Sequence, residues 1–177
     1  FLPATVGRRL YETLATNEYA IVDELGLADD RLYVPVDDAS VRLYVPQSDS
    51  ASVPAGAALS ETFVVTDTHH GVAVKPTGGS LFEEFEQALT GDLGDDPETV
   101  ARKLGDGLVE QFELVEQTEQ SVPAETTTAN GSLTIGITGS VYGPIEQFDH
   151  PVPSFFGVGL ADALDTPIEV SVDDGSD

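Results

Sequence analysis

The chain contains no cysteine, methionine or tryptophan among its 177 residues. Without a thiol it can form no disulfide, no thiolate nucleophile and no zinc–thiolate site. No apolar run reaches the roughly 18 residues that a membrane helix needs, and no signal peptide is recognisable. Because methionine is absent, we expect Phe1 to be a cut point. The apolar stretch Phe1-Leu2-Pro3 would then be the trailing edge of a removed segment.

Basic residues are also scarce, because seven lysines and arginines face 32 aspartates and glutamates, for a formal net charge of −25. This balance leaves no basic patch to replace counterions, which excludes free nucleic acid as a partner. Repulsion between like charges destabilises such a fold in dilute buffer, whereas at molar salt the Debye length falls to ~3 Å. The acidic residues are spread along the whole chain. The composition is therefore typical of a protein that works in concentrated salt, with a calcium buffer or a nucleic-acid mimic as the alternative.

The N-terminal part predicts a helix followed by two hairpins. Apolar residues with a period near 3.6 predict a helix over residues 3–25. The sequence Arg-Leu-Tyr-Val-Pro at 31–35 recurs at 42–46, and each copy predicts a short strand that its proline ends. A surface loop over 47–60, rich in Ser, Ala, Pro and Gly, separates this hairpin from a second one over 62–75.

The middle of the chain predicts two helices. Ser80 and Glu83 form a capping box ahead of an apolar pattern, which places a helix start at Ser80. Pro97 suits the first position of the next helix. Gly105 and Gly107 weaken that second helix by roughly 1 kcal/mol each. We expect these two glycines to allow close packing or to mark a bend.

The last third predicts a hairpin, a buried helix and a closing strand. The Asn130-Gly131 turn predicts that a strand over 133–141 pairs back on one at 114–119. The segment 153–164 consists mostly of apolar and small residues and is too short to cross a bilayer. It therefore predicts a central buried helix, followed by a strand at 168–172.

Together these elements predict one α+β domain over residues 1–172, with antiparallel β-hairpins packed on helices around the small-residue helix near the C-terminus. Residues 1–78 would supply the N-terminal helix and the hairpins. Residues 79–172 would supply the remaining helices and the strand–helix–strand part. Residues 173–177 are predicted to form a disordered tail.

The candidate site surrounds the start of the small-residue helix. The candidate ligand-binding residues, which would line an apolar pocket there, are Tyr142, His150, Phe155 and Phe156. With Asp149 and Ser154, His150 could form a nucleophile arrangement. However, the Gly-x-Ser-x-Gly elbow is missing, and a histidine that caps the helix or fixes the loop is the simpler interpretation. No residue is predicted to be catalytic.

No metal site and no cofactor are predicted. His69 and His70 are adjacent, so their side chains point apart in an extended segment or turn. The chain has neither a His-Glu-x-x-His motif nor an EF-hand loop. Gly157-Val158-Gly159 lies inside a predicted helix rather than after a strand, which excludes a dinucleotide-binding loop.

Two resemblances add to these expectations. Residues 1–27, the two Leu-Tyr-Val-Pro copies, the stretch Leu-Phe-Glu-Glu-Phe-Glu at 81–86 and residues 139–164 together resemble an uncharacterised haloarchaeal family. That resemblance implies a soluble C-terminal domain behind a membrane anchor, with no known activity. If an anchor precedes Phe1, the adjacent Arg8 and Arg9 would mark the cytoplasmic face of the membrane, with two solvated helix charges as the alternative. Residues 81–172 are also similar to small-ligand domains of the four-vinyl reductase type. This implies an apolar pocket, although the cysteines usual near the place of His150 are missing.

Three functions fit the sequence. The first is a non-enzymatic ligand-sensing or protein-interaction module of a membrane-anchored protein, with a small apolar ligand or a protein as its partner. It requires an apolar cavity beside the small-residue helix. The second is a hydrolase, which requires His150 in a cleft with Asp149 or Glu146 within hydrogen-bond reach. The third is a structural assembly domain, which requires an exposed apolar patch and a stable oligomer.

Overall fold

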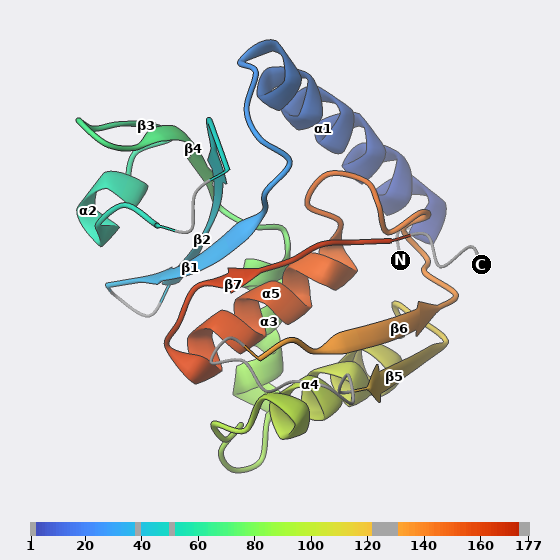
Figure 1. The fold of residues 1–177 in the computed structure, drawn as a ribbon. Coiled ribbons are helices and arrows are strands. Elements are labelled where there is room, and N and C mark those ends of the chain that lie inside the picture. Colours follow the sequence, from blue (N-terminus) through green and yellow to red (C-terminus); the bar gives the residue numbers. More distant parts are fainter. Residues whose placement is uncertain (1–2, 38–39, 50–51, 122–130, 174–177) are drawn as a thin grey trace.

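A five-stranded antiparallel sheet packs against helices, and a separate two-stranded hairpin lies beyond the helices (Figure 1). The computed structural model describes residues 3–37, 40–49, 52–121 and 131–173. This architecture confirms the predicted α+β class. Phe1, Asn130 of the predicted turn and residues 174–177 of the predicted tail lie outside the described residues.

The sheet is built from the two predicted hairpins and one short C-terminal strand. The repeated sequence forms β1 (Leu32–Val36) and β2 (Ser40–Pro46), and the second hairpin forms β3 (Phe63–Val65) and β4 (His70–Val74). The closing strand β7 (Ile168–Glu169) is shorter than predicted and pairs with the start of β1. The strand order is β3-β4-β2-β1-β7.

Successive side chains point to opposite faces of the sheet, and each face contributes to a different apolar cluster. Tyr33 and Leu43 belong to the main core, whereas Leu32 and Tyr44 belong to a smaller cluster with Leu59. Leu59 is fully buried and ends the short helix α2 (Gly56–Leu59). The prediction of a plain surface loop over 47–60 is therefore wrong at its end, because an apolar residue there covers the second face of the sheet.

The outer helices and the separate hairpin follow the predicted order. The long helix α1 (Ala4–Glu24) runs along the outside of the molecule (Figure 1). Two further helices, α3 (Gly78–Ala88) and α4 (Pro97–Asp106), precede a π-helical turn (Gly107–Gln111). The hairpin of β5 (Gln117–Ser121) and β6 (Thr134–Thr138) then lies beside α4.

The predicted capping box does not start α3, which begins two residues before Ser80. Its first amides are instead bound by distant side chains. The Thr77 N–H donates to Asp149 Oδ2 at 2.7 Å, and the Gly78 N–H donates to Ser154 Oγ at 2.9 Å. These tertiary bonds satisfy orphan donors that a local cap would otherwise serve.

The start of α4 and its two glycines behave as expected. Asp96 accepts a bond from the Thr99 N–H and Pro97 occupies the first helical position, as predicted. A Cβ on Gly105 would strike the Thr118 side chain, and one on Gly107 would lie 2.7 Å from the Phe85 ring. Both glycines therefore allow close packing, and the helix also changes to its π-helical turn at Gly107.

The small-residue helix is central, as predicted, and is α5 (Pro151–Leu164). It starts two residues earlier than predicted because Pro151 takes the first helical position. Residues 151–161 are all buried between the sheet and the helices α3 and α4 (Figure 1). Gly157 faces the Tyr33 ring of β1, and Gly159 faces Leu104 of α4. Glycine at these two positions lets both layers approach the helix backbone.

Candidate functional site

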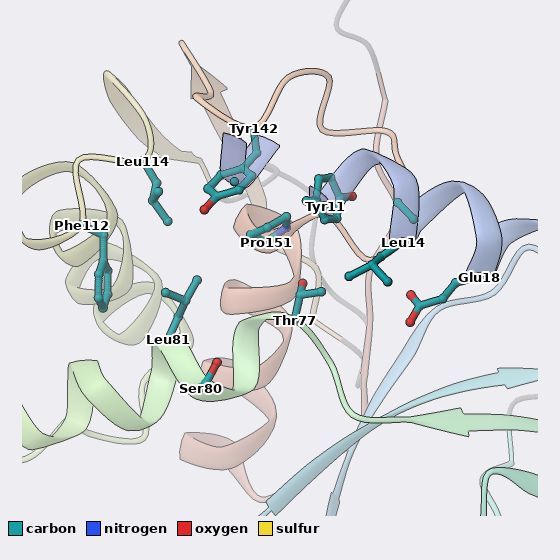
Figure 2. Close-up of a pocket in the computed structure, with 12 residues that line it drawn as sticks. Tyr11, Leu14, Glu18, Thr77, Ser80, Leu81, Phe112, Leu114, Tyr142 and Pro151 are labelled. Carbon is teal, nitrogen blue, oxygen red and sulfur yellow. The ribbon is translucent and has the colours of Figure 1, made fainter. Parts of the chain in front are cut away.

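A groove of about 390 Å³ opens between α1 and the N-terminal ends of α3 and α5 (Figure 2). Five separate parts of the chain line it, and most of the exposed lining is apolar. The lining residues are Gly7, Tyr11, Leu14, Ala15, Glu18, Thr77, Ser80, Leu81, Phe112, Leu114, Tyr142 and Pro151. Its size is that of a site for one small ligand.

Aromatic rings hold α1 over this groove. The Tyr11 ring meets the Tyr142 ring edge-on, with centroids 5.9 Å apart, and meets the His150 ring at 5.5 Å. The Tyr11 hydroxyl donates to the Phe148 carbonyl at 2.8 Å. Edge-on pairs of this kind add attraction beyond buried area. Tyr11 therefore fixes the distance between α1 and the loop that precedes α5.

The groove carries polar groups at one part of its wall. Glu18 of α1 and the side chains of Thr77 and Ser80 at the start of α3 line it together. Partial burial raises the pKa of Glu18. A ligand with an apolar body and one uncharged or cationic end would match this lining, because a carboxylate disfavours an anion beside it.

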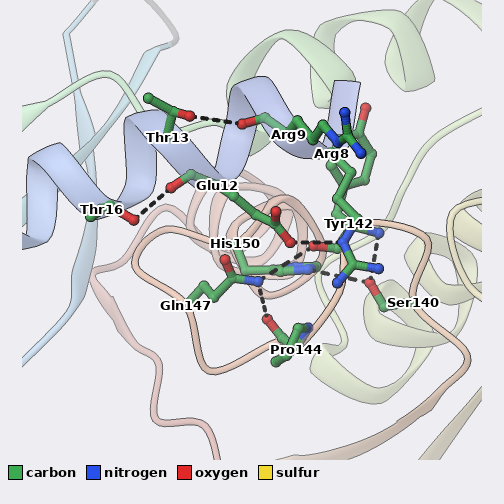
Figure 3. A network of polar contacts seen from close by, with 10 residues as sticks. All are labelled: Arg8, Arg9, Glu12, Thr13, Thr16, Ser140, Tyr142, Pro144, Gln147 and His150. Atoms are coloured by element: carbon green, nitrogen blue, oxygen red, sulfur yellow. Dashed lines mark hydrogen bonds and ion pairs between the residues drawn. The ribbon is translucent and has the colours of Figure 1, made fainter. Parts of the chain in front are cut away.

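His150 closes the N-terminal end of α5. Its Nδ1 accepts a hydrogen bond from the Val152 N–H at 3.1 Å, so Nε2 carries the proton and donates to Ser140 Oγ at 3.2 Å (Figure 3). The residue is 1% exposed, and burial lowers its pKa to about 4. This geometry is that of the neutral capping histidine. It does not provide the histidine in an open cleft that the hydrolase hypothesis requires.

Asp149 is the centre of a buried polar cluster beneath the groove. Its Oδ1 accepts from the Tyr33 hydroxyl at 3.0 Å, and its Oδ2 accepts from the Thr77 N–H. The Thr77 hydroxyl also donates to the Asp149 carbonyl at 2.6 Å. We call Tyr33, Thr77, Asp149 and Ser154 the clamp. It ties β1 and the start of α3 to the start of α5.

The carboxyl group of Asp149 has a pKa well above the usual value of an aspartate. Burial raises the pKa of Asp149 to about 7, although the hydrogen bonds from Thr77, Ser154 and Tyr33 oppose this rise. Its backbone has φ 45°, a left-handed conformation that aspartate tolerates better than most residues. The Asp149 carboxyl therefore bonds to the other three clamp residues rather than to His150, the neighbour that the sequence offered as its catalytic partner.

The four predicted ligand-binding residues fall into two groups. Tyr142 lines the groove. His150 lies under it and contacts the groove through Tyr11, whereas Phe155 and Phe156 are buried in the main core. Phe155 meets the rings of Phe82, Phe85 and Phe112 edge-on. Ligand binding by these four residues stays a prediction.

Sequence reasoning missed Tyr11, Leu14 and Leu81 as groove residues. The helical period explained each of them as part of an apolar face. The one available signal was that α1 carries more apolar residues than a single buried face needs. The position of the groove depends on how α1 lies against the body, and no local pattern encodes that.

The adjacent histidines lie away from this site. His69 contacts Ser52 Oγ through Nε2 at 3.0 Å and Thr68 Oγ1 through Nδ1 at 2.9 Å, while His70 starts β4. In the part of the chain that the structure describes, no three His, Asp or Glu side chains form a group that could hold a metal ion.

The fold and the groove define a small α+β domain with an apolar recess beside its N-terminal helix. The chain belongs to the family called Domain of unknown function (DUF7982), whose model matches residues 1–177. No curated protein and no solved structure matches the chain. None of the helices within the described ranges is long and apolar enough to span a membrane.

Proposed function

We propose that this domain is a non-enzymatic binding module that receives a small amphiphilic ligand in the groove between α1 and the starts of α3 and α5. The observation that carries the proposal is the composition of the groove wall. Leu14, Leu81, Phe112 and Leu114 offer apolar surface to one space, and Glu18 lies at its polar part.

Two features support binding over catalysis. The side chains of the clamp bond to each other and to backbone groups beneath the groove, and His150 is occupied as a cap. The groove wall itself therefore offers contact surface and a carboxyl group rather than a nucleophile with an adjacent base. This is the arrangement of a site that recognises a molecule without changing it.

The test is a thermal-shift titration in 3 M KCl, where the net charge of −25 is screened. Three C10 isoprenoid probes share one apolar body: geraniol, geranylamine and geranic acid. Ligand at 100-fold its Kd stabilises the folded state by about 2.7 kcal/mol, which raises Tm by about 5–10 °C in a chain of this size. We expect geranylamine and geraniol to raise Tm and geranic acid to do so least, because Glu18 faces the probe.

The matched variants are Leu114→Ala in the groove and Leu27→Ala outside it. Both leucines are half-buried and pack against the same core, so both variants remove similar packing. We expect only Leu114→Ala to reduce the shift by at least half. If no probe shifts Tm, or if both variants reduce the shift equally, the groove is not the binding site.

A further inference from the structure

Helix α1 exposes a row of large apolar side chains that its contact with the body does not use. Its buried residues are Tyr11, Ala15 and Val22. Leu10 and Leu14 are 63% and 61% exposed. Tyr19 is exposed on the far side of the buried face. At about 100° per residue, the other exposed large apolar side chains occupy one arc of about 100°, on the near side of the buried face. These residues, which we call the α1 stripe, are Val6, Leu10, Leu14, Ile21 and Leu25.

The spacing of four stripe residues is symmetric about a point between Asn17 and Glu18, in the C-terminal half of α1. Leu10 and Leu14 lie seven and three residues before Asn17, and Ile21 and Leu25 lie three and seven residues after Glu18. Two copies of α1 laid antiparallel about this midpoint would place Leu10 against Leu25 and Leu14 against Ile21 of the other copy. A two-fold interface requires a surface that is complementary to itself in this way.

The distribution of charges along α1 also favours antiparallel pairing of two copies. Arg8 and Arg9, two of only seven cations in the chain, lie near its N-terminal end, and Asp23 and Glu24 lie at its C-terminal end. Arg9 and Glu24 lie along the same side of the stripe. When two identical helices pack antiparallel, that side of one helix lies against the same side of the other. Arg9 of one copy would then lie near Glu24 of the other, whereas a parallel pair would bring the two Arg9 side chains together and the two Glu24 side chains together. Arg8 is already paired with Glu12, at 2.7 Å.

We propose that the α1 stripe is the interface of a two-fold symmetric dimer in which two copies of α1 pack antiparallel. In this register residues 11–24 of the two helices would overlap, over a length of about 21 Å. The proposal does not rest on the proposed ligand, because Leu10, Ile21 and Leu25 do not line the groove. Leu14 belongs to both surfaces and is therefore left unchanged in the test.

The first measurement is sedimentation equilibrium of the full chain in 3 M KCl between 1 and 200 µM. We expect a dimer, and we expect Ile21→Glu to raise its Kd at least 100-fold by placing a carboxylate in the apolar seam. The matched control is Val65→Glu on edge strand β3, where Val65 is 74% exposed. The control should leave the Kd unchanged, and all proteins should keep the wild-type circular dichroism spectrum.

The orientation is tested by cysteines, which the natural chain lacks. Mixed Leu10→Cys and Leu25→Cys chains should form a disulfide between copies on mild oxidation, because a disulfide needs Cα atoms within about 7 Å. Leu10→Cys alone should not, because its two copies lie at opposite ends of the pair. A monomeric wild type at 200 µM, a dimer that Ile21→Glu leaves intact, or self-linking of Leu10→Cys overturns the proposal.

Discussion

Replacing Tyr33 by phenylalanine should destabilise the protein by an amount that depends on pH, because the lost hydroxyl donates to a carboxyl group that titrates near neutrality. The ring of Tyr33 packs against Gly157, so phenylalanine keeps that contact. The substitution removes the 3.0 Å hydrogen bond to Asp149 Oδ1, together with the hydrogen bond between the Tyr33 hydroxyl and Ser154. Tyr33 is 2% exposed and Asp149 is 6% exposed, so water cannot readily replace the missing donor.

The magnitude follows from the charge state of Asp149, whose pKa burial raises to about 7. At pH 8.5 the carboxylate is ionised in the folded protein, and losing a hydrogen bond to a charged group costs about 1.5–3 kcal/mol. At pH 5.5 the carboxyl is protonated, and the loss of a bond between neutral groups costs about 0.5–1.5 kcal/mol. The variant should therefore be about 1 kcal/mol more destabilised at pH 8.5 than at pH 5.5.

The assay is urea denaturation followed by circular dichroism in 3 M KCl at both pH values and one fixed protein concentration. The repeat supplies the control, because Tyr44 occupies in its second copy the place of Tyr33 and is 1% exposed. Its hydroxyl donates to the His70 carbonyl at 3.3 Å, a group that does not titrate. Tyr44→Phe should cost the same at both pH values. If Tyr33→Phe loses the same free energy of unfolding at pH 5.5 and pH 8.5, or loses more at pH 5.5, then Tyr33 does not bond to a carboxyl group that ionises between these pH values.

Two further predictions concern the start and the middle of α5. Burial lowers the pKa of His150 to about 4, so the unfolded chain takes up the proton first and wild type loses stability as pH falls from 6.5 towards 4. His150→Asn keeps a good N-cap without this proton uptake. In urea denaturation, the free energy of unfolding of wild type relative to this variant should fall by about 2–3 kcal/mol between pH 7 and pH 4.5. A difference that stays constant with pH would contradict the assignment of His150 as a buried neutral cap. Gly157→Ala would place its Cβ 2.5 Å from the Tyr33 ring and should cost about 1–3 kcal/mol by overpacking. Gly79→Ala, whose Cβ would meet only Pro76 Cγ at 3.8 Å, should cost nothing in the same denaturation assay, and equal losses would show that backbone effects dominate.

The parts of the fold that the sequence predicts well are those that local patterns determine. The period of α1, the repeated strands β1 and β2 and the small-residue composition of α5 each carry their own signal. Gly157 and Gly159 also show why α5 is central, since a helix that lacks side chains on two faces can pack against two layers. Alternation then places Tyr33 and Tyr44 on opposite faces of the sheet.

The features that sequence reasoning missed depend on residues far apart in the chain. Ser80 and Glu83 satisfy the rule for a capping box, but the start of α3 is fixed by Asp149 and Ser154 instead. These residues lie 72 and 76 positions from the amides that they bind. The groove has the same origin, because α1 closes it over the start of α5 and no segment contains the pattern alone.

The clamp lies directly beneath the groove and fixes one side of it, the floor formed by the starts of α3 and α5. The other side of the groove, the wall formed by α1, is held by fewer contacts. Thr77 lines the groove while its N–H and hydroxyl both bond to Asp149, and Pro151 lines it directly after the capping residue of α5. The floor is therefore held by buried polar bonds. The opposite wall, α1, is held by three buried residues, one of which, Tyr11, also bonds to the body. A ligand in the groove and a second copy on the stripe would both act on α1, so both proposed interactions would stabilise the least anchored element of the fold.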